Sequence, residues 1–259
     1  MSYENILLQT DEQYVGSITL NRAEQLNTFT SQMASELHRA LRELDADPKV
    51  RVIVVKGAGK AFCAGIDINE LEGKTALQYK AWIEHMEQPL VAISQISKPV
   101  IAMVQGVAAA NGMGLAVAAD LTIAAENAKM GLTAINVGLN CVGPVIPVAR
   151  MVGRKKALEL LLYGDLIKAP EAMALGLINR IVPKDNLEQA TQEWAVNLAR
   201  KSPVAVQIAK KAFYGSEDMG YSQQFDYMND AFARLCTTKD AKEGVAAFLE
   251  KRRPEWNEC

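Results

Sequence analysis

Continuously apolar runs alternate with helix-like segments along the first half of the chain. Four runs are predicted to be strands: residues 14–20, 50–57 (VRVIVVKG), 98–106 (KPVIAMVQG) and 120–128 (DLTIAAENA). Strands without polar interruption are typical of a parallel sheet whose two faces are both covered by helices. The alternation therefore predicts an α/β fold that is built on a mainly parallel sheet.

The helices between these strands carry boundary signals of their own. Residues 30–46 repeat apolar side chains at spacings of three and four, with Thr30 as the predicted N-cap and Pro48 just beyond the end. A second helix begins near residue 76 and meets Pro89, which is expected to bend or restart it because proline disrupts a helix interior.

From residue 143 onward the pattern is mainly helical. Helical spacing occurs in residues 144–152, 154–163, 170–176, 185–200, 203–214 and 220–250. Residues 178–183 add one late strand, and no linker or low-complexity run separates the two halves. We therefore expect a core over residues 1–200 and a C-terminal helical region over residues 201–259, which packs on the core or on a neighbouring subunit.

Composition excludes several classes of function. The 259 residues carry a net charge of −2, so there is no basic excess to attract nucleic acid. No stretch approaches the roughly 20 apolar residues of a membrane-spanning helix. The N-terminal sequence MSYENILLQT lacks the features of a secretory signal, so we expect a cytoplasmic protein with no membrane partner.

Cysteine and histidine are sparse and scattered. The residues are Cys63, Cys141, Cys236, Cys259, His38 and His85, with no C-x-x-C pair among them. This pattern predicts free thiols in a reducing compartment and no metal site.

Two glycine-rich turns follow neighbouring predicted strands and carry the chemical signal. The first spans residues 62–67 (FCAGID), and the second spans residues 106–114 (GVAAANGMG) and leads into a helix. Glycine permits tight turns, and amides at a helix N-terminus present partial positive charge. Two such turns would be able to direct N–H groups at one oxygen and stabilise negative charge on it. Alternatively, the glycines serve only turn geometry and packing, which would give the same pattern. The G-x-G-x-x-G spacing of a dinucleotide-binding site is not met, so the turns do not indicate such a site.

Both turns belong to a longer series of matching segments. These are residues 20–29 (LNRAEQLNTF), 47–71, 98–128, 161–183 (LLYGDLIKAPEAMALGLINRIVP) and 241–256 (AKEGVAAFLEKRRPEW). Together they resemble the crotonase (enoyl-CoA hydratase/isomerase) superfamily over nearly the whole chain. Within this superfamily the chain most resembles the enoyl-CoA hydratase domain-containing protein 3 type branch, through the segments VAAANGMGL and INVGLNCVGP. The resemblance implies a spiral of ββα turns with a C-terminal helical oligomerisation region, assembled as a homotrimer or a dimer of trimers.

The resemblance also implies an acyl-CoA thioester as ligand, with no cofactor beyond its coenzyme A moiety. By motif position, the backbone N–H groups of Ile66 and Asn111 would bind the thioester carbonyl. Asn111 stands where the family usually has glycine. The residues that would contact coenzyme A are Ala64, Ile66, Asp67, Ile68, Asn69 and Asn111.

The carboxylates that the family uses for hydration are missing. Two glutamates hold and split water in its hydratases, and the corresponding positions are Gly114 and Ala134. Isomerases of the family need one carboxylate, at Ala134 or near Val142, and neither is acidic. We therefore predict an enzyme that stabilises an enolate or oxyanion without standard hydration, such as a decarboxylase or a thioester hydrolase. The alternative is an acyl-CoA-binding protein without catalysis.

A possible acid or base lies on the predicted helix before Pro89. Its sequence AWIEHMEQ contains His85 and Glu87, and a related dehalogenase branch places a catalytic histidine on this helix. A solvated helix face is the alternative. The pair Lys210-Lys211 is either a phosphate-binding patch or a solvated face.

Aromatic side chains recur near the C-terminus. They are Phe225, Tyr227, Phe232 and Phe248. They would line an acyl tunnel or form packing and subunit contacts, and the sequence leaves both alternatives open.

Overall fold

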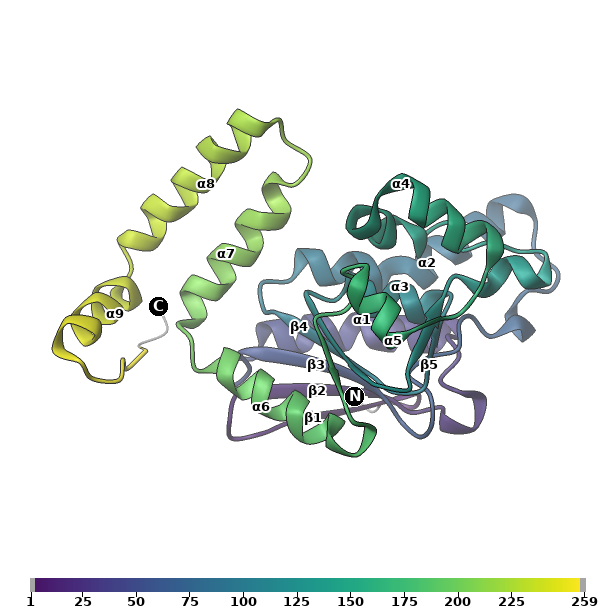
Figure 1. Ribbon diagram of the computed structural model, residues 1–259, viewed down its shortest axis with the longest axis horizontal. Coiled ribbons are helices and arrows are strands. Elements are labelled where there is room, and N and C mark those ends of the chain that lie inside the picture. The colour runs from purple at the N-terminus through teal and green to yellow at the C-terminus, as the bar shows by residue number, and fades with distance from the viewer. Residues whose placement is uncertain (1–2, 257–259) are drawn as a thin grey trace.

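The structure is a computed structural model that describes residues 3–256 (Figure 1). Its larger sheet has the strand order β1-β2-β3-β4-β6-β9, and a smaller sheet has the order β5-β7-β8. The strands are β1 (Ile6–Thr10), β2 (Val15–Leu20), β3 (Val52–Gly57), β4 (Val100–Val104), β5 (Val107–Ala109), β6 (Leu121–Ala125), β7 (Lys129–Gly131), β8 (Ile167–Lys168) and β9 (Arg180–Val182). In the larger sheet β1 pairs antiparallel with β2, and the remaining neighbours pair in parallel. The predicted α/β fold with a mainly parallel sheet is confirmed.

The helices follow most of the predicted boundaries. They are α1 (Ser31–Ala46), α2 (Ala76–Gln95), α3 (Asn111–Ala118), α4 (Val145–Tyr163), α5 (Ala169–Ala174), α6 (Leu187–Ala199), α7 (Pro203–Ser216), α8 (Tyr221–Cys236) and α9 (Lys239–Glu250). Thr30 caps α1 as predicted, because its side chain accepts a hydrogen bond from the Met33 amide.

The structure corrects one prediction about helix boundaries and refines another. One helix, α2, runs through Pro89 to Gln95, so the predicted restart is wrong. The segment 220–250, predicted only to carry helical spacing, forms two helices, because the Thr238 side chain accepts from the Ala241 amide and begins α9.

Alternate side chains of a strand point to opposite faces of the sheet, and a different helix covers each face. On β2, a side chain at Gly16 would meet Leu44 of α1, so α1 covers the face of residues 16, 18 and 20. The alternate residues Val15 and Ser17 line a cavity with Thr191 of α6 on the other face. The buried side chains of both layers form one core.

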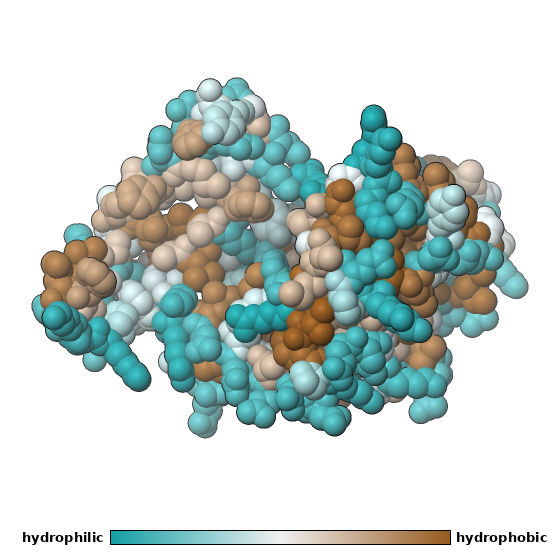
Figure 2. All heavy atoms as spheres, viewed as in Figure 1, coloured by the Kyte–Doolittle hydropathy of each residue, from teal (hydrophilic) through white to brown (hydrophobic). Residues whose placement is uncertain are grey.

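The C-terminal helices extend away from this core. In Figure 1, α7 and α8 form a hairpin that projects from the sheet, and α9 folds back at its end. Figure 2 shows hydrophobic side chains on this arm, and three of the four aromatic side chains singled out in the sequence are exposed: Phe225 (56%), Phe232 (66%) and Phe248 (82%). Over the described part of the chain, no helix combines the length and apolar character needed to cross a membrane.

A buried ion pair attaches the arm to the sheet. Lys210 Nζ of α7 lies 2.7 Å from Asp120 Oδ2 and 2.8 Å from the carbonyl oxygen of Lys98. Asp120 Oδ2 also accepts from the Val100 amide, and Tyr214 donates to Asp120 Oδ1. The prediction of a phosphate patch is therefore wrong for Lys210, because its ammonium group is buried against a carboxylate of the core.

We predict that Lys210→Ala lowers the free energy of unfolding by about 3 kcal/mol, because it leaves the carboxylate of Asp120 buried without its cation. The neighbouring Lys211 is exposed, so Lys211→Ala should change it by less than about 0.5 kcal/mol. Urea denaturation of both variants measures the difference. Equal effects would contradict the role of the ion pair.

Candidate functional site

The two glycine turns lie against each other. Cys63 forms a parallel bridge with Ala108 of β5, in which the Ala109 amide donates to the Cys63 carbonyl at 2.9 Å. A Cβ atom on Gly112, in the first turn of α3, would lie 2.1 Å from that same carbonyl oxygen. Only glycine fits there, and its absent side chain lets α3 begin directly beside the first turn.

The peptide between Gly65 and Ile66 directs its N–H toward the second turn. The Gly65 carbonyl accepts a hydrogen bond from the Phe29 amide at 2.8 Å. Since C=O and N–H of a trans peptide point in opposite directions, the Ile66 N–H points away from Phe29. A Cβ on Gly65 would lie 3.2 Å from the Ala110 Cβ, which places the second turn beside this peptide.

The peptide between Ala110 and Asn111 is arranged in a comparable way. The Ala110 carbonyl accepts from the Gly114 amide inside α3, so the Asn111 N–H points out of the N-terminal end of the helix. Within residues 3–256, neither the Ile66 nor the Asn111 amide has a hydrogen-bond acceptor. Two adjacent turns thus present unpaired backbone donors.

The backbone is strained where the second turn enters the helix. Ala110 has φ 49° and ψ −115°, a conformation that costs an L-residue on the order of 1–3 kcal/mol. Its amide donates to the Gly131 carbonyl at 2.8 Å, and this bond helps to hold the conformation. Such strain is frequent where a backbone is held in place for binding.

The side chain of Asn111 adds a second unusual feature. Asn111 is only 2% exposed, and its Nδ2 atom is buried with no hydrogen-bond partner in the described structure. A buried donor without an acceptor is costly in a folded protein. The turn therefore holds unpaired donors on both backbone and side chain.

The segment that follows Ile66 is held in a fixed conformation by Asp67. Its carboxylate accepts from Arg22 at 2.9 Å and from the Asn69 amide at 3.1 Å, and so begins a short 3₁₀ helix at Ile68. Burial alone would raise the pKa of Asp67, but hydrogen bonds from Arg22 and Asn69 outweigh it and hold the pKa below its usual value. The side chain of Ile68 is exposed, so an apolar group lies beside the turn.

Packing explains why position 114 carries no carboxylate. A Cβ atom on Gly114 would lie 2.8 Å from the Pro144 Cβ and 2.9 Å from Leu90 Cδ2. The space that a glutamate would need is filled by these two side chains. Ala134 is only partly buried, in a short 3₁₀ helix over Thr133–Val137, so packing does not exclude a longer side chain there.

His85 faces α1. Its Nε2 atom lies 2.9 Å from Ser35 Oγ and 2.9 Å from the carbonyl oxygen of Ser31. Both partners belong to α1, so the structure does not bring His85 together with Glu87, which lies on another side of α2. The second histidine, His38, contacts Gln88 across the same helix pair rather than being fully solvated.

Glu87 is the predicted site residue with the most unusual surroundings. Its side chain is partly exposed, but its Oε1 atom is buried without a hydrogen-bond partner. A Cβ on Gly143 would lie 1.7 Å from this oxygen, so the carboxyl group occupies the space that glycine leaves open. Burial, and to a smaller extent the charge of Glu84, raise the pKa of Glu87.

Cys141 lies in the same loop and is a buried free thiol. Burial raises its pKa, which disfavours a nucleophilic thiolate. Cys63 is also buried, and burial raises its pKa to about 12. Cys259 lies outside the described residues, and within them no group of His, Cys, Asp and Glu is arranged to hold a metal ion.

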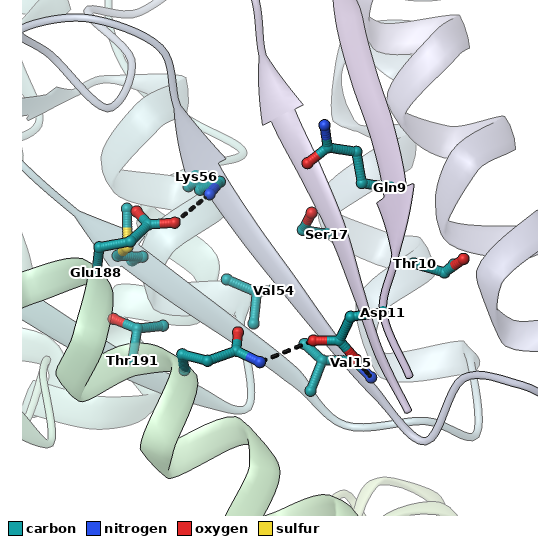
Figure 3. Close-up of a pocket in the computed structure, with 11 residues that line it drawn as sticks. Gln9, Thr10, Asp11, Val15, Ser17, Val54, Lys56, Glu188 and Thr191 are labelled. Atoms are coloured by element: carbon teal, nitrogen blue, oxygen red, sulfur yellow. Dashed lines mark hydrogen bonds and ion pairs between the residues drawn. The ribbon is translucent and has the colours of Figure 1, made fainter. Parts of the chain in front are cut away.

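A separate cavity of about 490 Å³ lies on the face of the sheet covered by α6 (Figure 3). Its charged side chains are paired with other side chains of the wall: Lys56 with Glu188, and Asp11 with Gln192 at 2.7 Å. It lacks the unpaired buried polar atoms found at Asn111 and Glu87. We therefore assign the candidate site to the two turns.

Solved structures share this architecture. A crystal structure of an enoyl-CoA hydratase from Mycobacterium smegmatis superposes with a TM-score of 0.95 and 35% identity, covering 98% of this chain and 99% of that one. The fold is therefore that of the crotonases. The chain belongs to the enoyl-CoA hydratase/isomerase family, whose model matches residues 10–259.

Individual relatives are similar over almost the whole chain. A putative enoyl-CoA hydratase from Thermus thermophilus is 36% identical over 253 residues, covering 96% of this chain and 100% of that protein. The mitochondrial enoyl-CoA hydratase domain-containing protein 3 of Xenopus laevis is 30% identical over 246 residues, covering 95% of this chain and 84% of that protein. The predicted superfamily is confirmed, and a member of the predicted branch is among the relatives.

We predict that Gly114→Glu lowers the free energy of unfolding by at least about 3 kcal/mol, because the new side chain collides with Pro144 and Leu90 and buries a carboxylate. Ala134→Glu, at the other position, should stay within about 1 kcal/mol. Chemical denaturation of the two variants measures this contrast. A Gly114→Glu variant as stable as the parent would show that the position is not closed by packing.

The raised pKa of Glu87 predicts a pH-dependent stability. An acid whose pKa is higher in the folded than in the unfolded chain stabilises the fold when protonated, and this contribution is lost as pH rises through the folded pKa. Glutamine stays neutral, so Glu87→Gln should gain in Tm relative to the parent as the pH rises above about 4, the pKa of an unperturbed glutamate. The exposed Glu193 of α6 offers the comparison variant, since Glu193→Gln also removes a carboxylate but leaves Glu87 and Glu84 unchanged. A constant difference for Glu87→Gln would contradict the assignment.

Proposed function

We propose that the protein binds an acyl-CoA thioester at the two glycine turns and stabilises its enolate or oxyanion. The thioester oxygen would accept hydrogen bonds from the Ile66 and Asn111 amides. Ala64, Asp67, Ile68 and Asn69 would line the path of coenzyme A beside them. No cofactor beyond the coenzyme A moiety is needed for this role.

The observation that carries the proposal is the pair of unpaired amides in adjacent turns. The Ile66 N–H points away from Phe29, and the Asn111 N–H points out of the end of α3. Fixed donors of this kind stabilise negative charge more effectively than water does, because they need no reorganisation during the reaction. The family supports the ligand class, since the relatives named above are described as enoyl-CoA hydratases.

We propose further that standard hydration is not the main reaction. Hydration of an enoyl thioester needs an acid and a base at the water molecule, and positions 114 and 134 are glycine and alanine. An enolate can also arise by decarboxylation or by proton removal at C2, and an oxyanion arises in thioester hydrolysis. Each of these reactions uses the same pair of amides.

A protein that binds acyl-CoA without turning it over is the second candidate. It is favoured by the packing at Gly114, where Pro144 and Leu90 have filled the place of a catalytic side chain. The two candidates share the ligand and differ only in turnover.

The C-terminal region supports an assembly of several copies. Its exposed apolar side chains include Phe232, Val245 and Phe248, and isolated chains rarely expose so many large side chains on one arm. We propose a homotrimer or a dimer of trimers in which residues 201–259 contact the neighbouring core. Because these side chains are exposed in the single chain, we favour subunit contacts as their role rather than the lining of an acyl tunnel. A cytoplasmic location stays a prediction.

The direct test uses butyryl-CoA, whose C2 protons exchange with D₂O if the enolate forms. We expect saturable binding by calorimetry and measurable exchange by mass spectrometry. Incorporation of the α-hydroxy acid analogue of asparagine at position 111 replaces the Ala110–Asn111 amide by an ester, removes this one N–H, and should slow exchange by about 10²–10³. Asn111→Ala keeps the amide and serves as the control, and circular dichroism confirms that both variants fold.

Crotonyl-CoA tests the claim about hydration in the same protein preparation. We expect hydration to be slower by at least about 10² than in a hydratase with both glutamates. Binding of butyryl-CoA without exchange would favour the non-catalytic candidate. Exchange at the parent rate in the ester variant at position 111, or hydration at the rate of a two-glutamate hydratase, would contradict the proposal.

A further inference from the structure

A carboxyl oxygen without a partner lies at the wall of an apolar cavity. The cavity has a volume of about 310 Å³ and is enclosed by α2, α3, α4 and the end of α7. Glu87 of α2 lines it, and its Oε1 atom has no hydrogen-bond partner. An unpaired buried carboxyl is costly, so a structural role does not account for this residue.

The other charged groups of this cavity are paired among themselves. Arg150 of α4 forms ion pairs with Glu217 at 2.7 Å and with Asp218 at 3.0 Å. Among the described residues no cation pairs with Glu87, and α3 contributes only apolar side chains to the wall, from Val117 and Ala118. The Oε1 atom of Glu87 is therefore an unused hydrogen-bond acceptor on a side chain that lines the cavity.

The packing of α2 on α3 places Glu87 at the level of the two turns. Leu90 of α2 reaches Gly114 of α3. Helix α2 leads into β4 and α3 leads into β6, and these two strands pair in parallel, so the two helices run in broadly the same direction. Glu87 precedes Leu90 by three residues, as Asn111 precedes Gly114, and three residues of a helix span about 4.5 Å. Glu87 thus lies beside the first turn of α3.

We propose that Glu87 is the acid and base of this site, supplied from α2 in place of the missing glutamates. The inference rests on the proposed binding of an acyl-CoA thioester. The C2–H bond of the acyl group breaks, and the proton forms an O–H bond on the Glu87 carboxylate. The electron pair enters the enolate, whose oxygen accepts from the Ile66 and Asn111 amides. The neutral acid then returns the proton to carbon, so no other reactant is consumed.

The surroundings of Glu87 suit this role. Burial raises its pKa, which makes the carboxylate a stronger base than that of an exposed glutamate. The other candidate on this helix, His85, contacts Ser31 and Ser35 of α1 instead. Position 114 is closed by Pro144 and Leu90, and Gly143 leaves the space into which the Glu87 carboxyl fits.

The test compares binding and C2 exchange of butyryl-CoA in the full chain. Glu87→Gln keeps the shape of the side chain and removes the base. We expect its dissociation constant for butyryl-CoA to stay within about twofold of the parent value, and the exchange rate to fall by at least about 10². The exposed Glu193 of α6 supplies the matched control, and Glu193→Gln should exchange at the parent rate.

A second variant separates catalysis from structure. Glu87→Ala opens space beside Gly143, and added formate should restore part of the exchange, since a small carboxylate can occupy the vacated position. Parent-like exchange in Glu87→Gln would overturn the inference and leave thioester binding intact. Exchange lost in Glu87→Ala but not restored by formate would also count against it. A parent protein that fails to bind butyryl-CoA would overturn the proposed function itself.

Discussion

The close approach of helix α3 to the carbonyl of Cys63 determines where both glycine turns lie. A Cβ atom at Gly112 would come within 2.1 Å of that oxygen, so the helix can start there only because the side chain is absent. The Ala109 amide holds the same carbonyl from β5. As a result, the Ile66 and Asn111 peptides are neighbours although 45 residues separate them in sequence. The cost includes a strained Ala110 and an unpaired Asn111 side chain.

The same tight packing also determines where a carboxylate fits between α2, α3 and the loop at Gly143 and Pro144. Pro144 and Leu90 close over Gly114, which removes the position that hydratases of the family use for one glutamate. One residue before Pro144, Gly143 leaves a space, and the carboxyl of Glu87 fills it from the opposite helix. The loop at Gly143 and Pro144 thus leaves no room for a carboxylate at position 114 of α3, but it leaves room for the Glu87 carboxylate of α2. The fold of the family is retained, and the proposed acid and base lies on α2.

The sequence predicted elements well where the signal is local. Thr30 and Pro48 bounded α1 because capping and proline geometry act within one turn. The turn amides were predictable because glycine spacing and family motifs both mark them. Contacts between distant segments were not predictable: Lys210 looked like a surface cation, yet it pairs with Asp120, which directly precedes β6 and lies 90 residues away in the chain. Likewise, nothing in AWIEHMEQ shows that His85 faces α1 while Glu87 faces Gly143, because that depends on which helices flank α2.

The most direct measurement of the central claim is a crystal structure of the protein with bound butyryl-CoA. The account predicts that the thioester oxygen lies about 2.7–3.2 Å from the backbone nitrogens of both Ile66 and Asn111, in line with their N–H bonds. A thioester oxygen that contacts only one of these nitrogens, or that is bound by other groups, would contradict it.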